Sequence, residues 1–142
     1  MHMKTGRKRE YDPLKFPQII ASVQRARGSI GQIADFNHIA RQTLRDWISY
    51  GDEDTQNRLR TDIGQFSCIL REKQAEVVME MCETALADEK KSKFIMWWLG
   101  KICREDFGVE GMEIKELRDL FKVILPLLGK DSNYDQRQNE QA

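Results

Sequence analysis

The chain has 142 residues, enough for one domain or two very small ones, and its 23 Lys/Arg and 23 Asp/Glu give a formal charge of zero. The zero hides an asymmetry, because residues 1–50 hold nine bases and four acids, or +5, and the remainder carries −5. A basic half of this kind favours a nucleic-acid partner. No apolar run reaches the ~20 residues of a membrane span, and three cysteines without a CxxC spacing suit a reducing compartment.

The chain opens with a polar, basic segment, residues 1–12, which we interpret as a flexible arm that contacts DNA phosphates. The basic residues expected to make these contacts are Arg7, Lys8 and Arg9. Asp12 followed by Pro13 has the residue types of a helix start, an acceptor at the cap and a proline in the first turn. Apolar residues at helical spacing then continue to Gly28 and predict a first helix.

Residues 13–51 have the pattern of a helix-turn-helix domain. Ser29 can cap a short helix, Ala34 is small where a second helix would cross the first, and Ile39 can fill the corner after the turn. The residues expected to be buried on the second helix are Leu44, Trp47 and Ile48. The same pattern also fits a plain three-helix core whose polar face happens to be basic.

We place the turn at Asn37–His38, where Asn37 can adopt the left-handed conformation that glycine usually supplies, and we end the second helix at Gly51. The N-terminal part of such a helix faces base edges in the major groove. Arginine pairs well with guanine, glutamine with adenine, and threonine with phosphate or a thymine methyl. The helix-turn-helix residues expected to contact DNA are Gln32, Arg41, Gln42, Thr43 and Arg45.

Residues 52–108 predict a long antiparallel helical hairpin that oligomerises. Residues 52–62 are a polar linker or an exposed helical lead-in, and an apolar stripe over 63–86 predicts a helix of roughly 36 Å. A charged turn at 87–92 leads to a second, aromatic-rich helix. Its paired tryptophans are expected to pack in the core or between subunits, with a base-stacking platform as the alternative. The residues proposed for subunit contacts are Phe66, Leu70, Val77, Met81, Trp97 and Trp98.

Residues 109–142 are expected to form a short amphipathic segment and a disordered tail. Three arrangements remain open for the segment: a helix docked on the hairpin, a partner-binding helix, or a strand pair in a barrel. A helical stripe fits best, and a partner would contact its apolar residues. These are Leu117, Leu120, Phe121 and Ile124.

At this point the chain resembles a known family. Residues 97–108, WWLGKICREDFG, are similar to the WLLERRFPEEFG-type segment that closes the helical hairpin of small terminase subunits in tailed bacteriophages. Ahead of that segment lie, in the family's order, a basic arm, a helix-turn-helix opening with GSI, a Trp-containing recognition helix and a long helix. The resemblance covers residues 14–108 and departs from the family at Arg104, where Pro is frequent, and at Ala40, where Ser is frequent.

The resemblance implies a ring-forming, non-catalytic DNA-packaging protein in the host cell cytoplasm. Its helix-turn-helix domains would bind double-stranded viral DNA, and its hairpins would form the wall of a homo-oligomeric ring. The C-terminal segment would engage the large terminase subunit, which holds the ATPase and nuclease.

The residues give no reason to expect an enzyme. A phosphate loop requires GxxxxGK followed by Ser or Thr, and here Gly100–Lys101 is followed by Ile102. Neither histidine has metal-ligand spacing to a cysteine, so we expect no cofactor and no metal. Two other functions remain open: a helix-turn-helix transcription regulator that dimerises through its long helix, and an adaptor without a DNA role.

Overall fold

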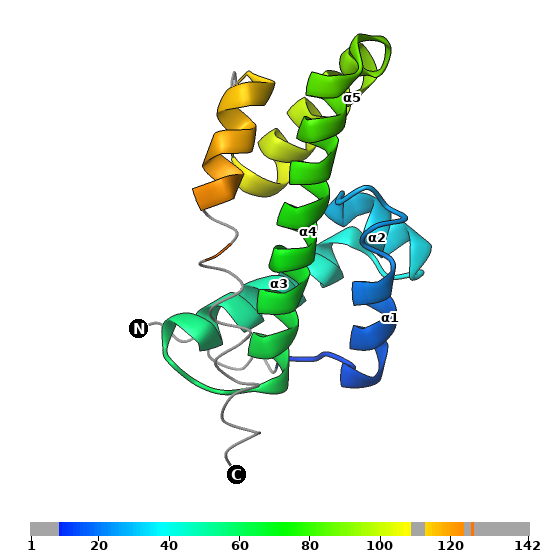
Figure 1. Ribbon diagram of the computed structural model, residues 1–142. Helices are drawn as coiled ribbons and strands as arrows, with labels where there is room; N and C mark the ends of the chain where they lie inside the picture. Colours follow the sequence, from blue (N-terminus) through cyan, green and yellow to red (C-terminus); the bar gives the residue numbers. More distant parts are fainter. Residues whose placement is uncertain (1–8, 109–112, 124–125, 127–142) are drawn as a thin grey trace.

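The computed structural model describes residues 9–108, 113–123 and 126, and every regular element within them is helical (Figure 1). This confirms the predicted all-α class. The elements are η1 (Pro13–Lys15), α1 (Phe16–Ala21), α2 (Ile30–Phe36), α3 (Arg41–Gln56), α4 (Asp62–Ala87), α5 (Glu89–Ile102) and the π-helical turn η2 (Cys103–Phe107). Residues 114–123 form a further helical segment.

Side-chain caps fix where most of these helices begin. An oxygen of the cap residue accepts a hydrogen bond from a first-turn backbone N–H and satisfies a donor that the helix leaves free. The capping residues are Asp12 for η1, Ser29 for α2, Thr61 for α4 and Asp88 for α5. Helix α3, like α1 and η2, begins without a side-chain cap, and the residue that precedes it is Ala40.

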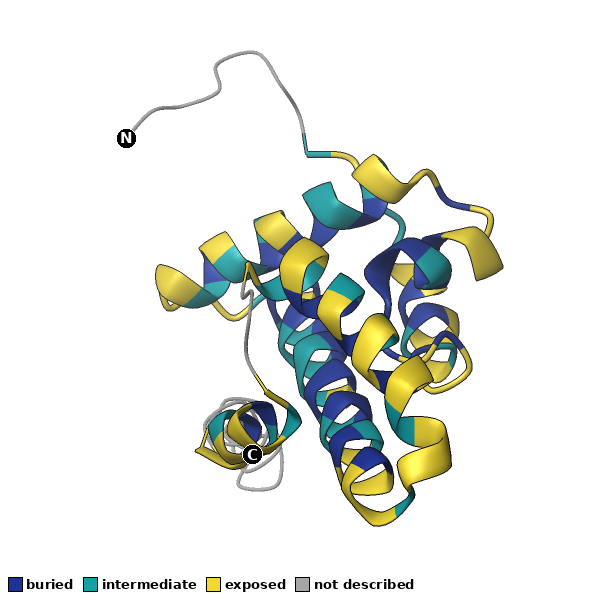
Figure 2. Ribbon diagram, turned by 90° about the horizontal axis from the view of Figure 1, so that it is seen from above, coloured by how far each residue is buried: buried dark blue, intermediate teal, exposed yellow. Residues whose placement is uncertain are grey.

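The long helix α4 is the centre of the molecule, and two hydrophobic clusters lie along it. Figure 2 shows buried residues along most of its length. The N-terminal cluster consists of Phe16, Ile19, Val23, Ala26, Ile30, Ile33, Ala34, Ile39, Leu44, Trp47, Ile48, Ile63, Phe66, Leu70 and Val77. The C-terminal cluster consists of Ala75, Val78, Cys82, Ala85, Ile95, Leu99, Ile102, Cys103, Leu117 and Phe121. Both clusters draw on α4, so the N-terminal helices and the hairpin share one core helix.

Helix α3 does not end at Gly51, as the sequence predicted, but continues to Gln56. Gly51 is instead the point where α3 and α4 come closest. A Cβ atom at Gly51 would lie 2.3 Å from the carbonyl oxygen of Ile63 and 2.5 Å from the hydroxyl of Ser67. Glycine is therefore needed here for helix packing and not for a chain reversal.

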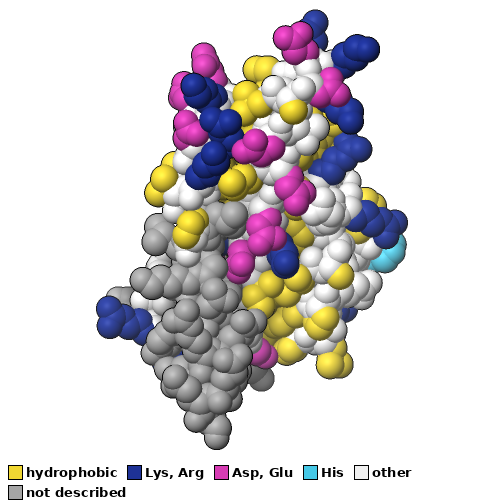
Figure 3. All heavy atoms as spheres, in the orientation of Figure 1, with side chains coloured by type: hydrophobic (Ala, Val, Ile, Leu, Met, Phe, Trp, Pro, Cys, Tyr) yellow, Lys and Arg dark blue, Asp and Glu magenta, His cyan; other side chains and the backbone are white. Residues whose placement is uncertain are grey.

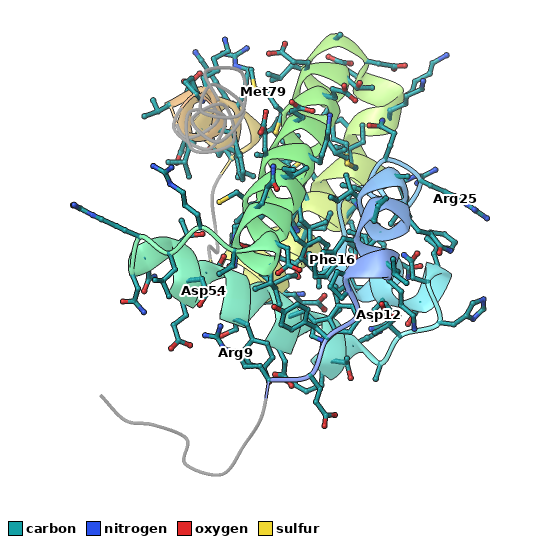
Figure 4. All side chains as sticks on the ribbon, turned by 90° about the horizontal axis from the view of Figure 1, so that it is seen from below. Arg9, Asp12, Phe16, Arg25, Asp54 and Met79 are labelled. Atoms are coloured by element: carbon teal, nitrogen blue, oxygen red, sulfur yellow. The ribbon has the colours of Figure 1, made fainter. Side chains whose placement is uncertain are left out.

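The polar stretch 52–62 is also not a free linker. Its Asp54 is buried, with a side chain only 6% exposed, and it accepts hydrogen bonds from Arg9 (2.7 Å) and from the hydroxyl of Thr61 (2.7 Å). Arg9 lies near Asp54 in Figure 4 and also pairs with Glu53 at 3.0 Å. The charge of Arg9, which the sequence assigned to a DNA-contacting arm, thus neutralises a buried carboxylate within the bundle.

Helices α4 and α5 form the predicted hairpin, with a shorter turn than expected. The charged stretch 87–92 is mostly helical, and the reversal needs only Asp88. At the other end of α5 the chain widens into the π-helical turn η2 and stops at Gly108, which has a left-handed backbone (φ +66°).

Three residues proposed for subunit contacts lie inside the chain's own core. Phe66, Leu70 and Val77 belong to the N-terminal cluster, and the ring of Phe66 stacks on that of Phe16 with a centroid distance of 4.1 Å. Residues so buried are not available to a neighbouring subunit. The apolar stripe on α4 is therefore explained by packing within one chain.

The C-terminal segment takes the helical alternative and docks on the hairpin. Leu117 and Phe121 are buried in the C-terminal cluster, and the ring of Phe121 meets that of Phe107 edge to face at 5.2 Å. These two residues are thus internal contacts and not a free partner surface. Leu120 is half-buried, and Ile124 lies outside the described residues.

Candidate nucleic-acid interface

Helix α2, the turn after it and α3 form a two-helix corner. Ala34 and Ile39 are buried at the corner, where the N–H of Ile39 donates to the carbonyl of Ala34 at 3.0 Å. His38 takes the left-handed conformation (φ +54°), whereas Asn37 stays at φ −100°, so the prediction that Asn37 supplies it is wrong. Asn37 instead uses its amide group, which donates to the carbonyl of Ile33 at 2.7 Å.

Arg41 and Gln42 lie exposed in the first turn of α3, and Thr43 is half-buried beside them. The guanidinium of Arg41 donates to both carboxylate oxygens of Asp35 on α2, at 2.6 and 3.2 Å. This hydrogen bond lowers the pKa of Asp35 and raises the pKa of Arg41. Gln42 donates to Asp46 at 2.9 Å. Each of the two exposed side chains already has an acidic partner, so the positive charge of Arg41 is neutralised locally by Asp35.

Arg45 does not point freely outward, as predicted, but lies 3.6 Å from a carboxylate oxygen of Asp106, whose side chain is only 2% exposed. The other oxygen of Asp106 accepts from the backbone N–H of Ile30 (3.1 Å) and from the amide of Gln74 (2.9 Å). Burial raises the pKa of Asp106, and the hydrogen bond from Ile30 and the charge of Arg45 oppose that rise. Asp106 thereby ties η2 to the first residue of α2 and to the middle of α3.

Two further side chains of the hairpin hold the loop between α1 and α2. The amide of Gln74 donates to the carbonyl of Gly28 at 2.7 Å, and the indole of Trp98 donates to the carbonyl of Arg27 at 3.0 Å. With Asp106 they define the loop clamp, three hairpin side chains that fix the entry to α2. Nothing in the local sequence marks these residues as positioning groups, because each contact joins distant parts of the chain.

The remaining predicted residues are divided between surface and core. Gln32 is half-buried on α2, and Met81 is half-buried between the two hydrophobic clusters. Trp97 is the most exposed predicted contact residue of the hairpin, at 61%. Arg7 and Lys8 lie outside the described residues.

The described residues hold no group of three or more His, Cys, Asp and Glu that could bind a metal ion. Burial raises the pKa of the Cys82 and Cys103 thiols to about 11, which keeps them protonated, and Cys68 is half-buried. None of the described helices combines the length and the apolarity needed to cross a bilayer.

Comparison of the chain with protein-family models, with curated proteins and with solved structures found no match. The geometry described above and the sequence resemblance are therefore the two supports for a functional proposal.

Proposed function

We propose that this chain is a non-catalytic DNA-binding protein that acts as the small terminase subunit of a tailed bacteriophage. The observation that carries the DNA-binding part is the exposed first turn of α3, which follows a compact two-helix corner and presents Arg41 and Gln42. Because Ala40 supplies no side-chain cap, the first N–H groups of α3 remain available to a phosphate. A helix start of this kind, on a helix-turn-helix scaffold, fits the major groove of duplex DNA.

The pairing of Arg41 with Asp35 supports a particular mode of binding. To contact a base or phosphate, Arg41 must exchange its carboxylate partner Asp35 for an acceptor on the DNA. The net gain in binding free energy from one subunit is therefore small. Several copies on one assembly would act together through a high effective concentration. Modest affinity for each subunit thus agrees with a ring oligomer that reads DNA through many weak contacts.

The terminase part of the proposal is supported by the resemblance of residues 97–108. That segment carries Trp98 and Asp106, two of the three loop-clamp residues that orient the helix-turn-helix. The large terminase subunit is the proposed partner of the C-terminal segment. Since Leu117 and Phe121 are buried, its contacts would be made by the half-buried Leu120 and by residues exposed on the same helix.

The alternative of a dimeric transcription regulator requires the long helix to form the dimer contact. Most apolar residues of α4 are already buried inside one chain, which counts against that arrangement. Exposed aromatic surface lies on α5 instead, at Phe94 and Trp97. Light scattering of the purified protein tests this directly: a mass corresponding only to a dimer would refute the ring.

DNA binding is tested with a pair of variants at one contact. We expect Arg41→Ala to weaken binding to duplex DNA and to reduce the slope of log K against log salt by about 0.9, the value for one lost phosphate contact. Asp35→Asn should strengthen binding, because it removes the carboxylate that competes for Arg41. Lys122→Ala, an exposed lysine on the C-terminal helix, serves as the control. If the wild type binds no duplex DNA at low salt, the proposed function is wrong.

A further inference from the structure

The hairpin carries a basic surface that the half-chain charge totals did not predict. We define the α5 basic face as the side chains of Arg25 and Arg27 from the loop after α1 and Lys90, Lys91, Lys93 and Lys101 from α5. Arg27, Lys90 and Lys91 line one open groove between that loop, α4 and α5, in which Glu80 is the acidic residue. Figure 3 shows Lys and Arg side chains along the edge of the molecule that carries α5 and α2. The acidic half of the chain thus contributes cations to the same surface as the basic half.

The cations of the α5 basic face differ from the arginines predicted to contact DNA in whether a carboxylate lies close to them. Among the described residues, Arg9, Arg41 and Arg45 each have a carboxylate within 4.0 Å. No ion pair within that distance joins any member of the α5 basic face to a described carboxylate. A phosphate can therefore bind this face without first displacing an internal acid, and each contact releases condensed counterions from the DNA.

Aromatic rings of α5 support two of these cations without neutralising them. The guanidinium of Arg27 lies 5.3 Å from the ring centroid of Phe94, and the ammonium of Lys101 lies 5.9 Å from that of Trp97 and 5.7 Å from that of Trp98. A cation–π contact restrains the side chain but leaves its charge uncompensated and its outward N–H groups free to donate. The rings of Phe94, Trp97 and Trp98 thus hold two of the cations of the α5 basic face.

The face is continuous with the helix-turn-helix. The guanidinium of Arg25 lies 4.7 Å from the ring centroid of Phe36, which is the last residue of α2 and precedes the turn into α3. From there the cations continue through Arg27 to the start of α5. The α5 basic face therefore reaches the end of α2 that leads into the turn before α3.

We propose that the α5 basic face binds the phosphate backbone of duplex DNA next to the site contacted by α3. The inference rests on the proposed DNA-binding function and extends it from the helix-turn-helix to the hairpin. The contacts are independent of base sequence, because phosphates carry no sequence information directly. Lysines dominate the face, which suits point-charge contacts to a backbone better than bidentate recognition of a base.

The test compares two double variants of the full chain. Lys90→Ala with Lys91→Ala removes two cations of the face, and Lys115→Ala with Lys122→Ala removes two exposed lysines from the C-terminal helix. For the first pair we expect the slope of log K against log salt to fall in magnitude by up to about 1.8, equally on specific and unrelated DNA. The control pair should leave the slope unchanged.

The outcomes separate this inference from the proposed function. Wild-type binding with equal slopes for both double variants would overturn the α5 contact and leave the helix-turn-helix contact standing. A changed oligomer mass with an unchanged slope would identify the face as a protein interface and would also overturn the inference. Absence of DNA binding by the wild type would refute both.

Discussion

Replacement of Gly51 by alanine tests how closely α3 and α4 must approach. Alanine improves helix propensity by about 1 kcal/mol, so propensity alone predicts a more stable protein. The structure predicts the opposite, because the new Cβ would lie 2.3 Å from the carbonyl oxygen of Ile63, within a helix that cannot rotate that oxygen away. Carbon–oxygen contacts normally lie near ~3.3 Å, so the two helices must separate by about 1 Å.

Overpacking of this severity costs about 3 kcal/mol, and the propensity gain leaves a net loss of about 2 kcal/mol. For a chain of this size we expect Gly51→Ala to lower the melting temperature by about 8 °C. Gly100 is the matched control, because it also lies inside a helix but a Cβ atom added there would meet no neighbouring atom within 4 Å. Gly100→Ala should raise the melting temperature by about 4 °C. Thermal unfolding followed by circular dichroism measures both, and a Gly51→Ala protein as stable as wild type would refute the proposed helix contact.

Three other predictions concern buried charges and thiols. Arg9→Ala should lower the free energy of unfolding by about 2 kcal/mol in urea titrations, because it leaves the buried Asp54 without its cation. Unchanged stability would mean that Arg9 is not needed in the bundle and would favour its predicted place in the arm. The pKa of Asp106 is higher in the folded chain than in the unfolded chain. The protonated side chain therefore stabilises the fold fully at a pH below the unfolded-state pKa, and this stabilisation is lost as pH rises through the folded-state pKa. Asp106→Asn should therefore gain stability relative to wild type as pH rises above the ordinary aspartate pKa of about 4, and a difference that does not change with pH would contradict the direction of the shift. The buried thiols of Cys82 and Cys103 have pKa values of about 11, so at pH 8 only roughly one molecule in a thousand carries either thiol in its ionised, reactive form. Cys68 is only half-buried. Alkylation of the native protein followed by mass spectrometry should therefore label Cys68 first.

Local rules predicted where most helices lie and several of their ends, although α1 ends at Ala21 and not at Gly28 as predicted. Asp12 and Ser29 cap helices where the sequence placed caps, since capping depends on residues three or fewer positions apart. Leu44, Trp47 and Ile48 are buried as their helical spacing predicted. The long helix α4 also begins and ends within a residue of its apolar stripe.

Features that depend on a partner helix were missed. Gly51 was interpreted as a helix stop because glycine disfavours helices, but its reason is the approach of α4, which no local pattern records. Asp54 lies in a highly polar stretch that resembles a linker, yet its carboxylate is buried because Arg9, 45 residues earlier, reaches it. The sequence shows that a residue is charged, but whether that charge is exposed to solvent or buried depends on which distant residue packs against it.

In the candidate site, too, local patterns predicted some features, and contacts with distant helices determined the others. The exposure of Arg41 and Gln42 at the start of α3 followed from the pattern, whereas the pairing of Arg45 with Asp106 required the hairpin to fold back on α3. Periodicity gave the apolar stripe containing Phe66 but could not distinguish the chain's own core from a contact between subunits. The α5 basic face was hidden for a related reason, because half-chain charge totals assigned Lys90 and its neighbours to an acidic region.

The sharing of α4 by both hydrophobic clusters has a consequence for how the molecule unfolds. Two domains joined by a linker could melt separately, but here loss of the C-terminal cluster would expose one side of the helix on which the N-terminal cluster depends. Met81, which packs against both clusters, lies at their junction. The chain should therefore behave as a single cooperative unit, with coincident transitions for the tryptophan of α3 and those of α5. Mechanical strain on the hairpin would then reach α3 without an intervening hinge.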